Sequence, residues 1–265
     1  MPPAKKRART YDPAKIRTAV LTQFGHVRRA VSGLTGEQLA LPTRLGSWTV
    51  RDLAAHVVLV VGVTSRALER DEPAKAELRL LEWPAAIAAR AGDIDDATRE
   101  LAGAHPDLGA LYADTEERLT RHLADAPGDR LLAVRTGTMS LADFLVTRTV
   151  ELVAHSDDLN AAVPGLGIPY DRQTLATCTR LLADALAAKA PGGSTEVRIP
   201  PYAVVQCVEG PRHTRGTPPN VVETDPLTWI RLATGRVAWQ DAVAEAKVSA
   251  SGERANLGGL LPVMA

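Results

Sequence analysis

The chain has 265 residues, in which 31 lysines and arginines balance 31 aspartates and glutamates. Without net charge it has no long-range attraction for polyanions, so the composition disfavours nucleic-acid binding. Hydrophobic residues make up 45% and aromatic residues only 4% of the chain, which predicts a folded protein rich in α-helix.

Markers of secretion and membrane insertion are missing from the sequence. No apolar run reaches the roughly 18 residues that a spanning helix needs, and no signal-peptide pattern opens the chain. Cys178 and Cys207 are too few for a disulfide framework and are not spaced as a metal motif. We therefore expect a cytoplasmic protein, a monomer or homodimer, without nucleic-acid partners or membrane insertion.

The N-terminal part begins with a predicted disordered tail over residues 1–12, which is rich in proline and alanine and is basic through Lys5, Lys6, Arg7 and Arg9. Apolar residues at three- and four-residue steps predict a helix over 13–34. Thr49, with Asp52 three residues later, predicts the capped start of a second helix that runs to about residue 70. His56 lies in the apolar centre of this second helix.

Three more helices follow in the prediction. Residues 71–92 are expected to form a connection with one short helix. Helical spacing returns over 107–126. Ser140 and Asp143 predict the start of a helix that ends near residue 163, and a fifth helix runs from about 171 to the break at Pro191.

The composition changes after residue 193, where short stretches with strand character alternate with helical ones. Strands are predicted over 197–199, 202–208, 221–223 and 247–250, and helices over 225–233 and 239–246. We therefore predict an α+β protein, with a helical bundle over 13–193 and a smaller α+β domain over 194–265.

Glu151 and His155 are the first candidates for chemistry, because residues four apart project from one face of a helix. Such pairs are common on solvated helix faces, so alone they indicate little. His56 is either a core histidine bonded to a carbonyl or carboxylate, or a third ligand facing the pair. Two imidazoles and one carboxylate inside a bundle would form a metal site with open positions, which suits zinc or iron(II). Asp158, one turn later, is either an exposed acidic residue or the partner that orients an imidazole.

Two segments carry a family resemblance. The stretch GSWTVRDLAAH, which ends at His56, and the stretch ELVAHSDD, which begins at Glu151, resemble helices of the mycothiol-dependent maleylpyruvate isomerase family, within the DinB-like metal-binding bundles. The resemblance covers roughly residues 13–190. From Thr195 onward the chain is similar to a sterol-carrier-type domain. The fold that this implies is a DinB-like four-helix bundle followed by a sterol-carrier-like domain.

The resemblance implies zinc held by His56, Glu151 and His155, with mycothiol as a thiol cosubstrate. A thiolate would attack a small electrophilic, carboxylate-bearing substrate, for isomerisation or for S-transfer. Arg231 or Arg236 would hold the substrate carboxylate, although a surface arginine at a helix end is the simpler interpretation of each.

Two other interpretations stay open. The chain could be a non-catalytic sterol-carrier-like protein that binds lipid, with the bundle as a scaffold. Alternatively, the metal could be structural, with a fourth ligand from Asp157, Asp158 or another chain.

Overall fold

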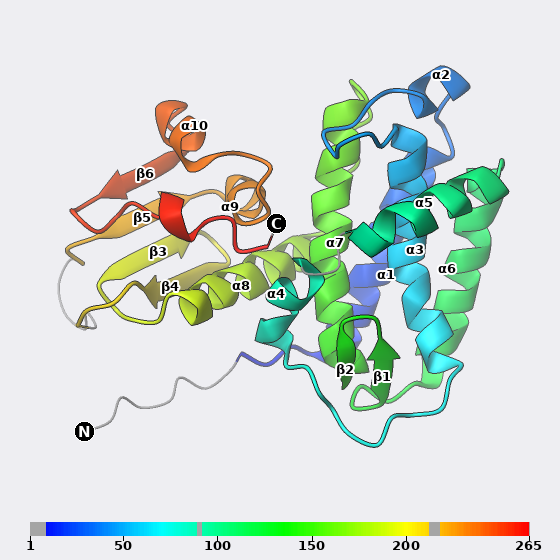
Figure 1. The fold of residues 1–265 in the computed structure, drawn as a ribbon, viewed down its shortest axis with the longest axis horizontal. Coiled ribbons are helices and arrows are strands. Elements are labelled where there is room, and N and C mark those ends of the chain that lie inside the picture. Colours follow the sequence, from blue (N-terminus) through cyan, green and yellow to red (C-terminus); the bar gives the residue numbers. More distant parts are fainter. Residues whose placement is uncertain (1–8, 89–91, 212–217, 265) are drawn as a thin grey trace.

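The computed structural model describes residues 9–88, 92–211 and 218–264. Four long helices form a bundle in which α1 and α3 each contact both α6 and α7 (Figure 1). They are α1 (Pro13–Val31), α3 (Val50–Leu68), α6 (Leu108–Asp125) and α7 (Leu141–Ala162). The predicted four-helix bundle is thereby confirmed.

The helices begin where side chains satisfy free backbone N–H groups. The Thr49 hydroxyl accepts from the N–H of Asp52, whose carboxylate accepts from the N–H of Thr49, as the sequence predicted. Ser140 caps α7 by accepting from the N–H of Asp143. These caps fix the starting points of the two helices that carry the candidate ligands.

Several short elements connect the long helices. The predicted connection over 71–92 contains the 3₁₀ turn η1 (Leu80–Glu82) and α4 (Trp83–Ala88), and α2 (Gly36–Leu39) precedes α3. The sequence analysis missed α5 (Gly92–Ala104), which packs on α3, and the antiparallel hairpin of β1 (Leu131–Val134) and β2 (Gly137–Ser140). Four-residue strands are too short to show an alternating pattern, so this hairpin gave no clear signal.

The C-terminal part contains a four-stranded sheet with the order β4-β3-β5-β6. Its strands are β3 (Thr195–Ile199), β4 (Ala203–Cys207), β5 (Val221–Thr224) and β6 (Val248–Ser251). Only β3 and β5 pair in parallel, while β3–β4 and β5–β6 are antiparallel. Helices α9 (Pro226–Ala233) and α10 (Trp239–Ala244) and the turn η2 (Gly258–Leu260) complete this part. The α+β class is confirmed.

Helix α8 (Arg172–Lys189) joins the two parts, since it packs on α1 and α7 and also contacts β4 and α9 (Figure 1). It also holds residue Arg9. Residues 1–8 of the predicted tail lie outside the described residues, but Arg9 differs from the prediction, because its Nε lies 2.8 Å from Asp184 Oδ2 in α8.

Among the described helices, none combines the length and apolarity that crossing a bilayer would require.

Candidate metal site

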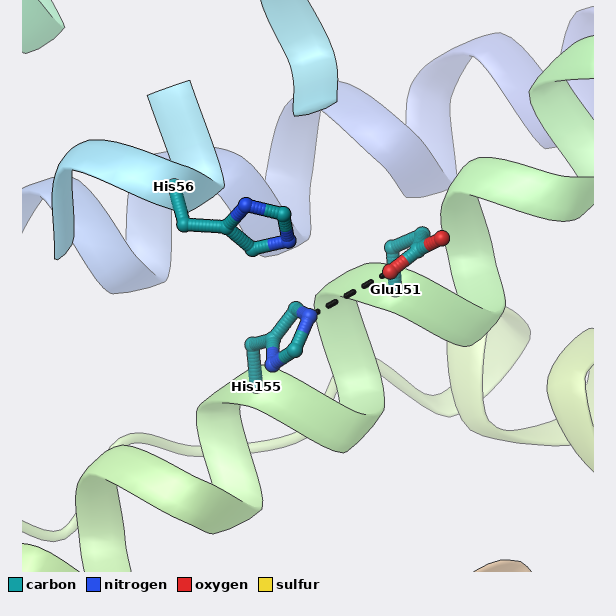
Figure 2. Close-up of side chains that lie close together, drawn as sticks. All are labelled: His56, Glu151 and His155. Carbon is teal, nitrogen blue, oxygen red and sulfur yellow. Dashed lines mark ion pairs between the residues drawn. The ribbon is translucent and has the colours of Figure 1, made fainter. Parts of the chain in front are cut away.

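Three candidate ligands from two helices meet inside the bundle. His56 projects from α3, and Glu151 and His155 project from α7 toward it (Figure 2). Their ligand atoms all lie within 4.8 Å of one another, and all three residues are buried. His155 Nε2 lies 3.3 Å from Glu151 Oε2. The pair alone was weak evidence, but its meeting with a buried histidine from another helix defines a site.

Each imidazole is oriented by a hydrogen bond on its Nδ1 side. His56 Nδ1 lies 3.2 Å from the hydroxyl of Thr98, a buried residue of α5, and His155 Nδ1 lies 3.0 Å from Asp158 Oδ2. Nε2 of both rings is left to face Glu151 (Figure 2). This is the arrangement in which outer groups fix the rings of metal-binding histidines. Thr98 escaped the sequence analysis because α5 itself was missed.

The protonation states of the isolated residues suit metal binding. Burial, and then the charge of His155, lowers the pKa of His56 to about 3, so its ring is neutral at neutral pH. Burial alone would raise the pKa of Glu151, but the hydrogen bond with His155 and the charge of Arg148 lower it to about 2. Burial also opposes the charged form of His155, yet its bonds to Asp158 and Glu151 raise its pKa. A metal would therefore meet an ionised carboxylate at Glu151 and a neutral imidazole at His56, and would compete with the proton that His155 binds more tightly than an ordinary histidine does.

The donor set fits a divalent ion. Two imidazole nitrogens and one carboxylate oxygen are typical ligands of zinc and of non-haem iron, and three protein ligands leave positions for water or substrate. The donors alone do not distinguish these two metals. His56, Glu151 and His155 are therefore the residues that could hold an ion.

Asp157 and Asp158 form a second buried cluster on α7, next to the candidate ligands. Arg44 pairs with both carboxylates, Arg231 donates to both oxygens of Asp157 at 2.6 and 2.9 Å, and Arg236 reaches Asp158 Oδ2 at 2.9 Å. The expectation that Asp158 is exposed is wrong: its side chain is fully buried, and two arginines from distant parts of the chain, Arg44 and Arg236, pair with it. With their oxygens so occupied, neither aspartate is placed as a fourth ligand.

The two arginines predicted for substrate binding therefore lie at the junction between the bundle and the C-terminal domain. Both are bound to aspartates of α7. They differ in one respect, since Arg236 lines the cavity beside the ligands, whereas Arg231 is not part of that lining.

The three candidate ligands lie in the wall of a cavity of about 990 Å³ between α3, α5, α7 and the hairpin. Its lining is largely apolar, but it contains the arginines Arg66, Arg70, Arg135, Arg148 and Arg236, with Asp95 and Glu151 as the acidic residues. Arg148 was missed by the sequence analysis, although it precedes Glu151 by three residues and so shares its helix face. The interior of the C-terminal domain is filled by fully buried side chains such as Ile199 and Trp229.

Two family models match the sequence. Residues 20–160 match the mycothiol maleylpyruvate isomerase N-terminal domain, and residues 171–263 match the bacterial SCP ortholog family. The second match includes α8 as well as the sheet domain. No curated protein matches the chain significantly.

Two similar solved structures are those of the mycothiol-dependent maleylpyruvate isomerase and of a histidine-to-alanine mutant of it. They share 18% and 17% sequence identity with this chain, with TM-scores of 0.59 and 0.60. In both cases the similarity covers 91% of this chain and 93% of the other. At this identity, the likeness concerns the fold.

Proposed function

We propose a thiol-dependent isomerase function, because this chain belongs to the mycothiol maleylpyruvate isomerase family, whose N-terminal domain model matches residues 20–160. Family membership supports an enzyme that acts on a small molecule together with a thiol. We infer further that the enzyme requires a divalent metal, which we propose to be zinc, and that its thiol is mycothiol. The substrate is a small electrophile with a carboxylate group.

The observation that carries this proposal is the convergence of His56, Glu151 and His155 in the wall of a large cavity. A site buried in a solid core would hold an ion for structure alone. A site that borders a cavity can admit a second molecule to the open positions of the ion.

A bound divalent cation would supply positive charge that favours the thiolate form of a thiol over the neutral form. The residues of the chain prepare the place for this chemistry. Thr98 orients the ring of His56, and Asp158 orients the ring of His155. Apolar lining residues such as Val60 and Phe144 exclude water from the reacting groups.

The isomerisation itself is a balanced addition and elimination. The thiolate sulfur bonds to one carbon of a conjugated double bond, whose electrons move toward the electron-withdrawing end of the substrate. The remaining single bond rotates, and the C–S bond then breaks to restore the double bond and the thiolate. Because the thiol is regenerated, no oxidant or reductant is needed, whereas S-transfer would stop at the adduct.

Arg236 is the better placed of the two C-terminal arginines for a role beside the substrate, because it lines the cavity. Its bond to Asp158 also connects the C-terminal domain to the residue that orients His155. Arg231, bound at both oxygens of Asp157, is proposed to hold the domains together.

The proposal is tested by elemental analysis and by an activity assay. Protein purified without affinity tag or added metal should contain about one equivalent of zinc, and His155→Ala should lose it. His105→Ala is the matched control, since His105 lies on the surface beyond the end of α5. The zinc-loaded protein should then convert maleylpyruvate only when mycothiol is present.

The outcomes separate the parts of the proposal. A wild-type protein that neither contains nor takes up a divalent metal would refute the metal site. A metal-loaded protein that turns over neither maleylpyruvate nor related unsaturated acids with mycothiol would refute the isomerase.

A further inference from the structure

Arg148 is a charged side chain in an unusual place. It lies in the middle of α7 with its side chain only 6% exposed, yet it lines the cavity that contains the candidate ligands. Its guanidinium carbon lies 4.4 Å from the centre of the Phe144 ring and 5.8 Å from that of Trp83. These aromatic contacts hold the charged group in a fixed position at the cavity wall.

The guanidinium keeps unused hydrogen-bonding capacity. Nη1 donates to the carbonyl of Val60 at 3.1 Å, and Nε and Nη2 both donate to the Thr147 hydroxyl, at 3.2 and 3.1 Å. A guanidinium carries five N–H donors, so two of them have no partner among the described residues. Buried donors without partners are costly, and they are uncommon unless a ligand or water completes them.

The charge of Arg148 is also incompletely balanced. The carboxylate paired with it is that of Glu151, whose Oε1 lies 3.8 Å from Nη2, beyond hydrogen-bonding distance. Glu151 is shared with His155 and with any ion in the site. An ion there would draw on the same carboxylate and leave Arg148 with still less compensation.

We propose that Arg148 binds the carboxylate group of the substrate and so places the reacting carbon next to the metal site. This inference rests on the proposed function and deepens it, because it makes the preferred substrate an anion whose carboxylate lies close to the reacting double bond. The two free N–H donors and the planar guanidinium match the two oxygens of a carboxylate. Arginines outnumber acidic residues five to two in the otherwise largely apolar lining, and this excess of positive charge favours entry of such an anion.

Binding of maleate to the zinc-loaded protein tests this inference without turnover. Maleate is a small unsaturated dicarboxylate, and its affinity can be measured by titration calorimetry in the absence of thiol. Arg148→Met removes the charge and the donors while keeping an apolar stem, and we expect roughly 10- to 100-fold weaker binding. Arg66→Met is the matched control, because it removes one exposed positive charge from the same cavity. Its effect should stay within about twofold.

A second variant guards against a folding defect. Arg148→Lys keeps the charge but cannot donate to both oxygens, so its affinity should fall between those of the wild type and Arg148→Met. Both variants should keep their zinc, which a role limited to supporting Glu151 would not allow.

Three results would overturn the inference. The first is no maleate binding by the zinc-loaded wild type. The second is wild-type affinity in Arg148→Met or, should that variant not fold, in Arg148→Lys, and the third is a loss of affinity in Arg66→Met as large as that in Arg148→Met. The second result would mean that the carboxylate binds the metal alone. If maleate binds through Arg148 but no isomerisation occurs, the proposed function fails while the anion site remains.

Discussion

Glu151 and Asp158 lie two turns apart on one face of α7, and both are buried carboxylates that contact the same imidazole. Asp158 lies at Nδ1 of His155 and is saturated by arginines from two other segments. Glu151 lies at Nε2, with a single arginine at the edge of its reach. A buried carboxylate is thus structural when arginine partners satisfy it, and it is available as a ligand when they do not.

Asp158→Asn should have the largest effect on folding, because it leaves the partly buried Arg236 without its carboxylate partner and Arg44 with that of Asp157 alone. We expect the free energy of unfolding to fall by about 3 kcal/mol at neutral pH, as measured by urea denaturation of the metal-free protein. The matched variant Glu151→Gln should lose less, because Glu151 has one arginine at the edge of its reach whereas Asp158 has two in direct contact. Equal losses in the two variants would show that both carboxylates are structural.

Glu151→Gln should instead have the larger effect on metal binding. The amide oxygen is a weaker ligand than a carboxylate, so we expect zinc affinity to fall by at least roughly 100-fold, measured by competition with a chelator. If the variant binds zinc as tightly as the wild type, Glu151 is not a ligand and the comparison fails.

Thr98→Ala tests the orientation of the His56 ring, which has a neutral partner where His155 has a charged one. Without the hydroxyl the ring can rotate, and zinc affinity should fall by about 10-fold. The thermal stability of the metal-free protein should change little beyond the loss of one hydrogen bond. Thr177→Ala, at a buried threonine of α8 away from the ligands, controls for that loss. An unchanged affinity in Thr98→Ala would remove α5 from the site.

Asp225→Ala should have the smallest effect, and it tests the helix that carries Arg231. Asp225 accepts from the backbone N–H groups of Leu227 and Thr228 at 2.9 and 3.0 Å, and caps α9. Burial alone would raise the pKa of Asp225, but a hydrogen bond with the Thr228 side chain and the two backbone bonds lower it. The cap therefore stabilises the fold above the ordinary pKa, and this stabilisation is lost as pH falls through the lowered value. The variant should lose about 1 kcal/mol at neutral pH. The stability difference from the wild type should begin to shrink below about pH 3.9 and vanish only below the lowered pKa, and a difference that stays constant in acid would contradict the assignment.

Much of the fold could be predicted from the sequence because it follows from local physical chemistry. The caps at Thr49 and Ser140 and the apolar spacing placed α3 and α7 to within a few residues. The strand character after residue 193 predicted the small α+β domain. The spacing of Glu151 and His155 put both on one helix face, and the apolar surroundings of His56 indicated that it would face inward.

The surroundings of the site residues depend on contacts between distant segments of the chain. Asp158 looked exposed in its local sequence, but Arg44 and Arg236 reach it from parts of the chain that no local pattern connects to α7. Thr98 and Arg148 acquire roles only because helix packing puts one against His56 and the other at a cavity wall. Helix periodicity determines the direction in which a side chain points, whereas the topology of the whole chain determines which residues it contacts. Those contacts decide whether a buried carboxylate is held in ion pairs or is available as a ligand.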